Sequence, residues 1–427
     1  MRIKHSASLL ALALMVTPLA ACGGDDGGGG GGGGDNAAFK ENLDSKGPIT
    51  YVQGKDNTGV VAQLIAKWNS EHPDEKVTVK EQTVDANQQH DDLVRNLQAG
   101  TADYDVMSVD LIWTAEFAAK GWLQPLPDLK LDGVLQPVVD SGNYNGTQYA
   151  APQTSDGGML YYRTDLVKTP PKSWDEMMGM CDIATKAKID CYAGQFAKYE
   201  GLTVNASEAI NGAGGQIVDA AGKPTVDSQE SIDGLDTLVQ AYADGNIPKA
   251  AITYKEEESR LSFQNGKLLF MRQWPYAYNL AQTEGSSKIK GKFAVAPLVG
   301  LDGPGTSSLG GHNNAVSAFS DHKATAIAFV NWIMEEEQQR LYTEKGGNAP
   351  VLESLYTDPQ LVKKYAYLPT LLESIKTAVP RPITPFYPAV SKAITDNAYA
   401  AMRGEKSAED AIKDMQAAME AASSSGQ

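Results

Sequence analysis

The 427-residue sequence is poor in basic residues, histidine and cysteine. It has 37 Lys and Arg against 53 Asp and Glu, a net charge of −16, five His and three Cys. Without residues 1–21, which hold two bases and no acid, 35 bases face 53 acids and the charge is −18. Nucleic acids and anionic membrane surfaces attract clustered Lys and Arg, so we expect neither as a partner.

The scattered His and the lack of Cys-x-x-Cys spacing predict no metal site, and we expect no cofactor.

Long hydrophobic runs are also missing. The apolar stretch at residues 9–16 is far shorter than the roughly 20 residues that span a bilayer. Because Arg2 and Lys4 precede it, residues 1–21 are predicted to be a signal peptide. The mature chain is therefore expected to have no transmembrane helix.

The end of this signal carries a more specific pattern. Leu19-Ala20-Ala21-Cys22 resembles the lipobox of bacterial lipoproteins, in which cleavage leaves Cys22 as a diacylated N-terminus. Residues 27–34 are eight consecutive glycines, and residues 22–47 are predicted to be a flexible tether. We expect a protein anchored by lipid alone to the outer face of the bacterial cell membrane, outside the cytoplasm. An ordinary signal peptide with an incidental cysteine is the alternative.

Two further cysteines, Cys181 and Cys191, are ten residues apart. Outside the cytosol, such a pair favours a local disulfide. Two buried free thiols are the alternative.

The first part of the body alternates between strand and helix patterns. An apolar run at 49–52 predicts a buried strand, and a helix capped by Asp56, Asn57 or Thr58 follows. The predicted series continues with a strand at 76–83, a helix around 91–97 and a strand at 104–109. This order is typical of a doubly wound parallel sheet, whose ligands bind beyond the carboxyl ends of the strands.

The rest of the chain continues as α/β structure. The patterns predict, in order, a strand at 159–162, helices around 173–188, 205–213 and 228–246, a strand at 267–271, a strand within 305–318, one long helix at 324–345, and an amphipathic helix at 407–422.

An ordered series of motifs runs through residues 48–427. They are Asp105-Val106, Asp110-Leu111-Ile112-Trp113, Phe117-Ala118-Ala119-Lys120-Gly121-Trp122-Leu123, Asp156-Gly157-Gly158-Met159-Leu160-Tyr161-Tyr162-Arg163, Tyr199-Glu200-Gly201-Leu202, Trp274-Pro275-Tyr276, Leu309-Gly310-Gly311, Arg381-Pro382 and Pro385-Phe386-Tyr387. The series resembles the sugar-binding receptors of bacterial ABC importers, and its trehalose/maltose branch most of all.

The resemblance implies an α/β fold of the type II periplasmic-binding-protein kind. Two lobes, each a doubly wound sheet flanked by helices, would be joined by a hinge and close on a ligand. Residues 48–155 plus 305–350 would form the N-terminal lobe, and residues 156–304 plus 351–427 the C-terminal lobe.

The implied function is the capture of an α-glucoside disaccharide, trehalose or maltose, for an ABC permease by a monomeric receptor that is not an enzyme. A different sugar or polyol is the first alternative, and a secreted glycoside hydrolase the second. A structural surface lipoprotein would not explain the motif series. No Gly-x-Ser-x-Gly or His-Glu-x-x-His motif is present.

Sugar binding requires flat apolar faces for the rings and polar groups for the hydroxyls. Trp274 and Tyr276 resemble the stacking aromatics of the family. Pro275 between them favours a loop that presents both rings to a cleft. A buried aromatic pair in the core is the alternative.

Four polar residues are candidates for the hydroxyl contacts. Asp110 follows the third predicted strand, and Asp156 matches a family carboxylate; a helix cap and a turn aspartate are their respective alternatives. Asn57 lies where relatives often carry an acid. Arg381 resembles an arginine that forks onto adjacent hydroxyls, with a salt bridge between the lobes as the alternative.

Gly310 and Gly311 would let backbone amides approach a ligand. Relatives frequently place an aromatic after this pair, where this sequence has His312-Asn313; we expect that departure to alter the sugar preference. Tyr199 and Glu200 are weaker candidates, and Glu200 has a helix cap as its alternative.

Overall fold

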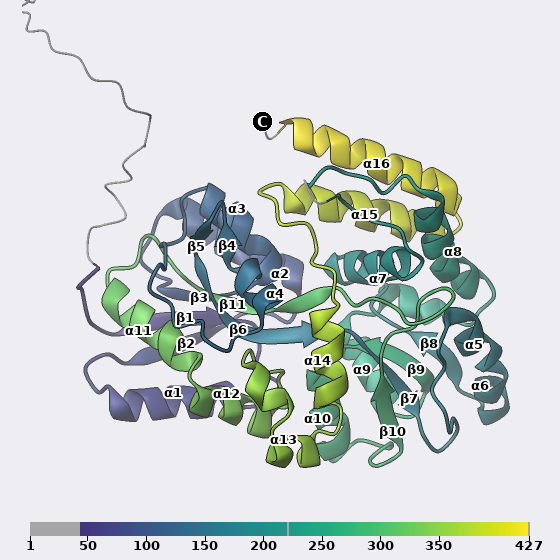
Figure 1. Ribbon diagram of the computed structural model, residues 1–427, viewed down its shortest axis with the longest axis horizontal. Coiled ribbons are helices and arrows are strands. Elements are labelled where there is room, and N and C mark those ends of the chain that lie inside the picture. Colours follow the sequence, from purple (N-terminus) through teal and green to yellow (C-terminus); the bar gives the residue numbers. More distant parts are fainter. Residues whose placement is uncertain (1–42, 220–221, 426–427) are drawn as a thin grey trace, which may run out of the picture. The chain divides into compact units, whose positions relative to one another are not determined.

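The computed structural model describes residues 43–219 and 222–425, which form two β-sheets with helices packed around each (Figure 1). The predicted signal peptide, Cys22 and most of the predicted tether lie outside these residues. Among the helices of the described part, none is both long enough and apolar enough to cross a membrane.

The first sheet has five strands in the order β2-β1-β3-β11-β6. β1 is parallel to β2 and β3, as the alternating pattern predicted, whereas β11 is antiparallel to both of its neighbours. Because the first three strands are parallel, their carboxyl ends meet at one edge. The strands are β1 (Ile49–Gln53), β2 (Val77–Glu81), β3 (Val106–Asp110), β6 (Ala150–Gly157) and β11 (Leu309–Val316).

Alternating side chains bury both faces of this sheet. Tyr51 and Val106 pack on the side of α1 and α11, together with Trp68 and Phe329. Their neighbour Val52 points to the opposite face, into the cluster that contains Leu93 and Phe117 of α2 and α3. Two buried faces explain why β1 and β3 are continuous apolar runs.

The second sheet has four strands in the order β10-β7-β9-β8, and only its β8–β9 pair is parallel. The expectation of two α/β lobes is confirmed, but each sheet is mixed rather than all parallel. The chain passes from one lobe to the other between strands. The side from which it re-enters a sheet sets the direction of the later strands in that sheet. The strands are β7 (Met159–Arg163), β8 (Asp190–Ala193), β9 (Leu268–Gln273) and β10 (Phe293–Ala296), and a separate hairpin pairs β4 (Asn143–Tyr144) with β5 (Thr147–Gln148).

Three chain segments pass between the two lobes and lie side by side. Gly158, the one residue between β6 and β7, donates its N–H to Ser307 Oγ at 2.6 Å. Val379 lies beside the start of β11. The N–H of Leu309 donates to the carbonyl of Val379, and the N–H of Val379 donates to the carbonyl of Ser307. These contacts form the connection about which the lobes would hinge. The predicted lobe boundaries stay a prediction.

The helices divide between the two sheets. Those next to the first sheet are α1 (Val60–Glu71), α2 (Ala86–Ala99), α3 (Thr114–Ala119), α4 (Gln136–Ser141), α11 (Lys323–Ile333) and α12 (Glu336–Leu341). Those of the second sheet and the C-terminal part are α5 (Trp174–Gly179), α6 (Cys181–Ala187), α7 (Glu200–Gly212), α8 (Gln229–Ala243), α9 (Glu256–Gln264), α10 (Tyr276–Thr283), α13 (Pro359–Lys364), α14 (Leu368–Lys376), α15 (Tyr387–Met402) and α16 (Ala408–Ser425). Of these, α14 packs against β6 of the first sheet.

Two features differ from the predicted elements. The expected single helix at 324–345 is two helices, α11 and α12, followed by a π-helical turn at Tyr342–Gly346. β6, β8, β10, α3, α4, α9 and α10 were not predicted, because short elements of four to nine residues carry little periodicity.

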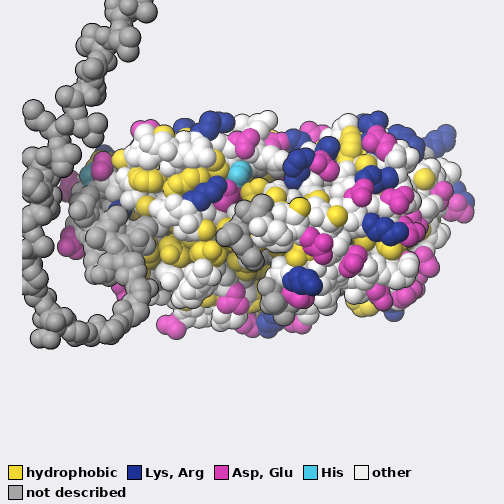
Figure 2. All heavy atoms as spheres, turned by 90° about the horizontal axis from the view of Figure 1, so that it is seen from above, with side chains coloured by type: hydrophobic (Ala, Val, Ile, Leu, Met, Phe, Trp, Pro, Cys, Tyr) yellow, Lys and Arg dark blue, Asp and Glu magenta, His cyan; other side chains and the backbone are white. Residues whose placement is uncertain are grey.

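Acidic and basic side chains are intermixed on the surface that carries α15 and α16 (Figure 2). In α16, for example, Lys413 pairs with Glu409 at 2.6 Å. The described residues visible on this face form no basic patch of the kind that nucleic-acid binding requires.

Candidate ligand-binding site

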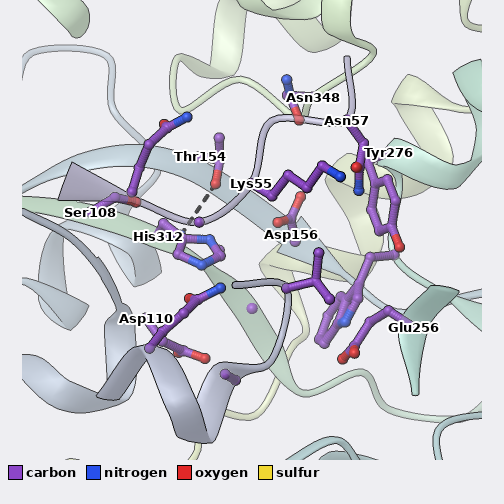
Figure 3. A pocket seen from close by; sticks show the side chains of 18 of the residues that line it. Lys55, Asn57, Ser108, Asp110, Thr154, Asp156, Glu256, Tyr276, His312 and Asn348 are labelled. Atoms are coloured by element: carbon purple, nitrogen blue, oxygen red, sulfur yellow. Dashed lines mark hydrogen bonds between the residues drawn. The ribbon is translucent and has the colours of Figure 1, made fainter. Parts of the chain in front are cut away.

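A cavity of about 320 Å³ lies at the carboxyl edge of the first sheet and is lined by both lobes. Its volume lies within the range of small-molecule sites, roughly 300–1,000 Å³. Figure 3 shows Asp156 near the middle of the view, with Asp110 and His312 on one side and Tyr276 and Glu256 on the other. The lining from the first lobe includes Gln53, Lys55, Asn57, Ser108, Asp110, Thr154, Asp156, Gly310, Gly311 and His312, and that from the second includes Glu200, Lys255, Glu256, Glu257, Trp274, Tyr276 and Arg381.

Of the nine residues predicted to bind a ligand, the structure brings eight to this cavity. The exception is Tyr199, which is only 3% exposed and is not part of the lining. Tyr199 is the N-cap of α7, so the next residue, Glu200, reaches the cavity in its place.

Trp274 is held from two directions. It follows β9 directly and is half-buried. The guanidinium carbon of Arg272 lies 3.8 Å from the ring centre, close enough for a cation–π contact with one face. A Cβ added to Gly310 would lie 2.6 Å from Cζ3 of the same ring. The exposed remainder of the indole therefore belongs to the cavity, which is the arrangement of a stacking platform.

Arg272 is itself fixed. Its Nε and Nη2 donate to the two carboxylate oxygens of Glu208 at 2.8 and 2.7 Å, and its exposed fraction is 1%. Nη1 donates to Gln195 Oε1 at 3.3 Å. A fully buried arginine with a bidentate carboxylate partner is rigid, so it keeps the Trp274 ring in place.

Tyr276 lies on a helix, which corrects the expectation of a loop. Pro275 is the N-cap of α10 and Tyr276 is its first residue. Proline is tolerated there because the first backbone N–H groups of a helix have no partner within the helix. The hydroxyl of Tyr276 donates to Glu257 Oε1 at 2.8 Å, and burial raises the pKa of this phenol well above its usual value.

Arg381 forms a salt bridge between the lobes, which was the alternative to a ligand contact. Its Nη2 donates to Asp110 Oδ1 at 2.9 Å and its Nη1 to Glu200 Oε1 at 2.7 Å. Asp110 closes β3 of the first lobe, whereas Glu200 begins α7 of the second. The side chain of Arg381 is 3% exposed, so this ion pair is shielded from water.

Asp110 and Glu200 have additional partners. The other role considered for Asp110 is also present, because its Oδ1 accepts the N–H of Ile112 at 3.3 Å. Glu200 accepts the hydroxyl protons of Tyr387 and Ser391. Burial raises the pKa of Glu200, although Arg381 opposes that shift. Both carboxylates are therefore partly committed to the protein.

Asp156, by contrast, accepts no hydrogen bond from another side chain of the described residues. It lies inside β6, opposite Gly310, rather than in a turn. Burial first, and then the charge of Asp110, raise the pKa of Asp156 to about 7, while Arg272 opposes the shift. A half-buried carboxyl that faces a cavity without a hydrogen-bond partner is available to a ligand donor.

The loop between β1 and α1 contributes two exposed residues to the cavity, Lys55 and Asn57. Asp56 shapes this loop, because its carboxylate accepts the N–H groups of Thr58 and Val61, each at 2.8 Å. Gly59, with φ of +73°, is the N-cap of α1. Asp56 thus caps the helix and leaves Asn57 free, which the sequence pattern alone did not distinguish.

Gly310 and Gly311 serve the packing of the protein. Gly310 gives room to the Trp274 ring, as described above. Gly311 has φ of +114° next to the register shift at His312/Asn313, and a Cβ there would lie 2.2 Å from Thr154 O. Both positions require glycine because of neighbouring protein atoms, a reason different from the predicted approach of backbone amides to a ligand.

Sequence reasoning missed several residues of the lining. His312 had been noted as a departure from the family, and it lines the cavity, whereas Asn313 is fully buried. Burial lowers the pKa of His312 against the opposing effect of Asp110, so its imidazole is neutral at pH 7. Glu256 and Glu257 were not predicted to line the cavity, although three consecutive acidic residues at 256–258 indicate the N-terminus of a helix.

The cysteine pair lies outside this site. Cys181 and Cys191 are joined in a disulfide with Cα atoms 5.1 Å apart, linking the start of α6 to β8. Neither residue lines the cavity.

The arrangement of a cavity between two α/β lobes agrees with comparisons to known proteins. Residues 53–340 match the family described as bacterial extracellular solute-binding protein, and the chain belongs to this family. A probable ABC transporter-binding protein of Deinococcus radiodurans is 32% identical over 340 residues, which cover 75% of this chain and 80% of the relative.

Two further proteins are informative about the range of ligands. The structure of maltose-bound T. maritima MalE3 has a TM-score of 0.83 and 32% identity, and covers 87% of this chain and 98% of its own. The mannitol-binding protein of Pseudomonas aeruginosa is 24% identical over 353 residues, or 78% of this chain and 80% of the relative.

These relationships define the class of the protein. It is an extracytoplasmic carbohydrate-binding protein of a bacterial ABC importer, and its partners are a sugar ligand and the importer's permease. Members of this family bind solutes and are not enzymes, which excludes the glycoside hydrolase.

Proposed function

We propose that the cavity captures an α-glucoside disaccharide, trehalose or maltose, and that the closed complex delivers it to the permease. The observation that carries this proposal is the Trp274 ring, fixed by Arg272 and Gly310 and exposed to the cavity beside the uncommitted carboxyl of Asp156. A flat apolar face next to a hydrogen-bond acceptor matches the two surfaces of a pyranose. The maltose bound to T. maritima MalE3 supports this choice of sugar.

In this proposal, Trp274 and Tyr276 stack on the sugar, while Asp156 and Asn57 bond its hydroxyls. Asp110 and Arg381 bond further hydroxyls through the carboxylate oxygen and guanidinium nitrogen atoms that take no part in their ion pair. Gly310 and Gly311 shape the wall of the cavity. Because the groups come from both lobes, they reach one ligand only when the lobes are closed. Binding would therefore shift the population toward the closed form that the permease recognises.

A different sugar or a polyol in the same cavity is the second candidate. The P. aeruginosa relative that binds mannitol favours it, as does His312 in the lining. A neutral imidazole donates one hydrogen bond and accepts another, which suits adjacent hydroxyls of an open-chain polyol as well as those of a ring.

We also propose that the mature protein is a monomer tied to the outer face of the cell membrane by lipid on Cys22. The support is the lipobox-like Leu19-Ala20-Ala21-Cys22 and the glycine run that follows it. Two acyl chains on one residue are sufficient for stable anchoring. The tether would let the binding lobes reach a permease in the same membrane.

The test is a thermal-shift screen of sugars and polyols followed by calorimetry on the unmodified chain, Trp274→Ala and Trp274→Phe. A ligand at 100 times its Kd stabilises the protein by about 2.7 kcal/mol. Trp274→Ala should cost about 1–3 kcal/mol of affinity, and Trp274→Phe, which keeps an aromatic face, should cost less. Equal affinity of all three proteins would remove Trp274 from the site. Tight binding of a polyol, with no affinity for trehalose or maltose, would select the second candidate.

A further inference from the structure

Two helix N-termini from opposite lobes meet at the border of the cavity. Asp85 is the N-cap of α2 in the first lobe, and Lys255 is the N-cap of α9 in the second. The ammonium group of Lys255 forms an ion pair with Asp85 Oδ2. Lys255 and the two neighbours of Asp85, Val84 and Ala86, line the cavity. The ion pair therefore joins the two lobes directly beside residues that line the cavity.

Both partners are held in place by defined contacts. Asp85 is 8% exposed, and its Oδ1 accepts the N–H of Gln88 at 3.0 Å. The backbone N–H of Lys255 donates to the Glu258 carboxylate at 3.0 Å, and its ammonium group lies 5.1 Å from the ring centre of Tyr199. Asp85 is therefore fixed by its own lobe, whereas the Lys255 side chain, which is 37% exposed, is positioned by its contacts with Asp85 and the Tyr199 ring.

A second polar contact crosses between the lobes beside the first. The N–H of Glu200 donates to Asn87 Oδ1 at 3.4 Å, and Asn87 lies in the first turn of α2. Three helix N-termini, those of α2, α7 and α9, thus converge on one side of the cavity. A ligand that extended past this side would have to separate them.

We propose that the Asp85–Lys255 ion pair is a clasp that limits the length of the bound carbohydrate, so that the site selects ligands of one or two rings against longer oligosaccharides. This inference rests on the proposed function. The cavity, at about 320 Å³, is near the lower end of small-molecule sites. A longer chain would break the pair and leave Asp85 buried without its cation, which is a penalty that a disaccharide avoids.

The experiment compares ligand lengths in full-length variants. Asp85→Asn keeps the helix cap and removes the charge, and Lys255→Met keeps an apolar stem without the ammonium group. Lys413→Met is the matched control, because Lys413 pairs with Glu409 in α16 and does not line the cavity. Calorimetry would measure the Kd of maltose, trehalose, maltotriose and maltotetraose for each protein.

We expect the unmodified chain to bind its preferred disaccharide at least tenfold more tightly than maltotetraose. In Asp85→Asn and Lys255→Met this ratio should fall at least fivefold, and in Lys413→Met it should not change. An unchanged ratio in the two clasp variants, or a uniform loss of affinity for every sugar, would overturn the clasp while leaving sugar binding intact. If the unmodified chain binds none of the four sugars, the proposed choice of sugar fails and the clasp fails with it.

Discussion

The contact between Gly310 and Trp274 gives a sharp prediction for the substitution Gly310→Ala. The new Cβ would lie 2.6 Å from Cζ3 and 2.8 Å from Cη2 of the indole. Ordinary Cβ contacts begin near 3.4 Å, so the ring must move by about 0.8 Å. Arg272 lies 3.8 Å from the ring centre and is fixed by Glu208, so the ring has no room to retreat in that direction.

The ring is therefore expected to move into the cavity and out of the position in which it stacks on a sugar. Loss of the stacking position should cost about as much affinity as Trp274→Ala, about 1–3 kcal/mol. Expressed in affinity, that is an increase in Kd of about 5- to 150-fold. Calorimetry with the ligand found in the sugar screen would measure it. Gly303→Ala is the matched control, because a Cβ there meets nothing within 4 Å, and its Kd should match that of the unmodified chain.

A double-mutant cycle with Trp274→Ala tests the cause as well as the effect. Without the indole, the methyl group of Gly310→Ala has the space it needs, so the substitution should cost almost no affinity in the Trp274→Ala background. If Gly310→Ala weakens binding equally in both backgrounds, its effect does not act through the ring. Unchanged binding in the single variant would refute the whole argument.

Three further predictions concern the anchor, the disulfide and Asp156. Cys22→Ala should release the protein from the membrane fraction without changing sugar affinity; a variant that still sediments with membranes would contradict the lipid anchor. Free-thiol labelling of the unreduced, denatured protein should detect neither Cys181 nor Cys191, and reduction should lower the free energy of unfolding by roughly 2–3 kcal/mol; full labelling of both would disprove the pairing. The native pKa of Asp156, about 7, is above the usual 3.8, so the native state binds the extra proton. The ligand-free protein should therefore lose stability as the pH rises from 4 to 7, and Asp156→Asn, followed by chemical denaturation, should remove that part of the slope; an identical slope in the variant would assign it to other groups.

The first sheet was largely predictable from the sequence, because local patterns encode parallel βα units. The apolar run at 49–52 became β1, and Asp110 at the end of β3 lies at the carboxyl edge, as the topology requires. The antiparallel strands β6 and β11 were not predictable in the same way. Their direction depends on where the chain crosses between lobes, which is a contact between residues such as Gly158 and Ser307, 149 positions apart.

The candidate site was predictable as a set of residues, but their roles were not. The order of the motifs correctly predicted that Asp110 and Arg381 line the cavity. Their mutual ion pair joins residues 271 positions apart, so no local sequence pattern could predict it. Gly310 was predicted to belong to the site because a residue without a side chain lets a ligand approach the backbone. In the structure, the Trp274 ring occupies the space that a side chain at Gly310 would need. Tyr276 was placed in a loop because proline is usually a helix breaker, whereas at a helix start it is permitted.

The polar groups of the cavity fall into two sets with different energetic consequences. Asp110, Glu200 and Arg381 bond one another across the lobes, and a ligand that displaced any one of them from these ion pairs would leave a buried charge without its partner. Asp156 and Asn57 have no such commitment, so a ligand can bond them without breaking a protein contact. The first set therefore stabilises closure, and the second set, together with the free face of Trp274, is left to discriminate among ligands. The sugar preference of this receptor should thus respond more to changes at Asp156 than to changes at the ion pair, which should alter affinity for every ligand alike.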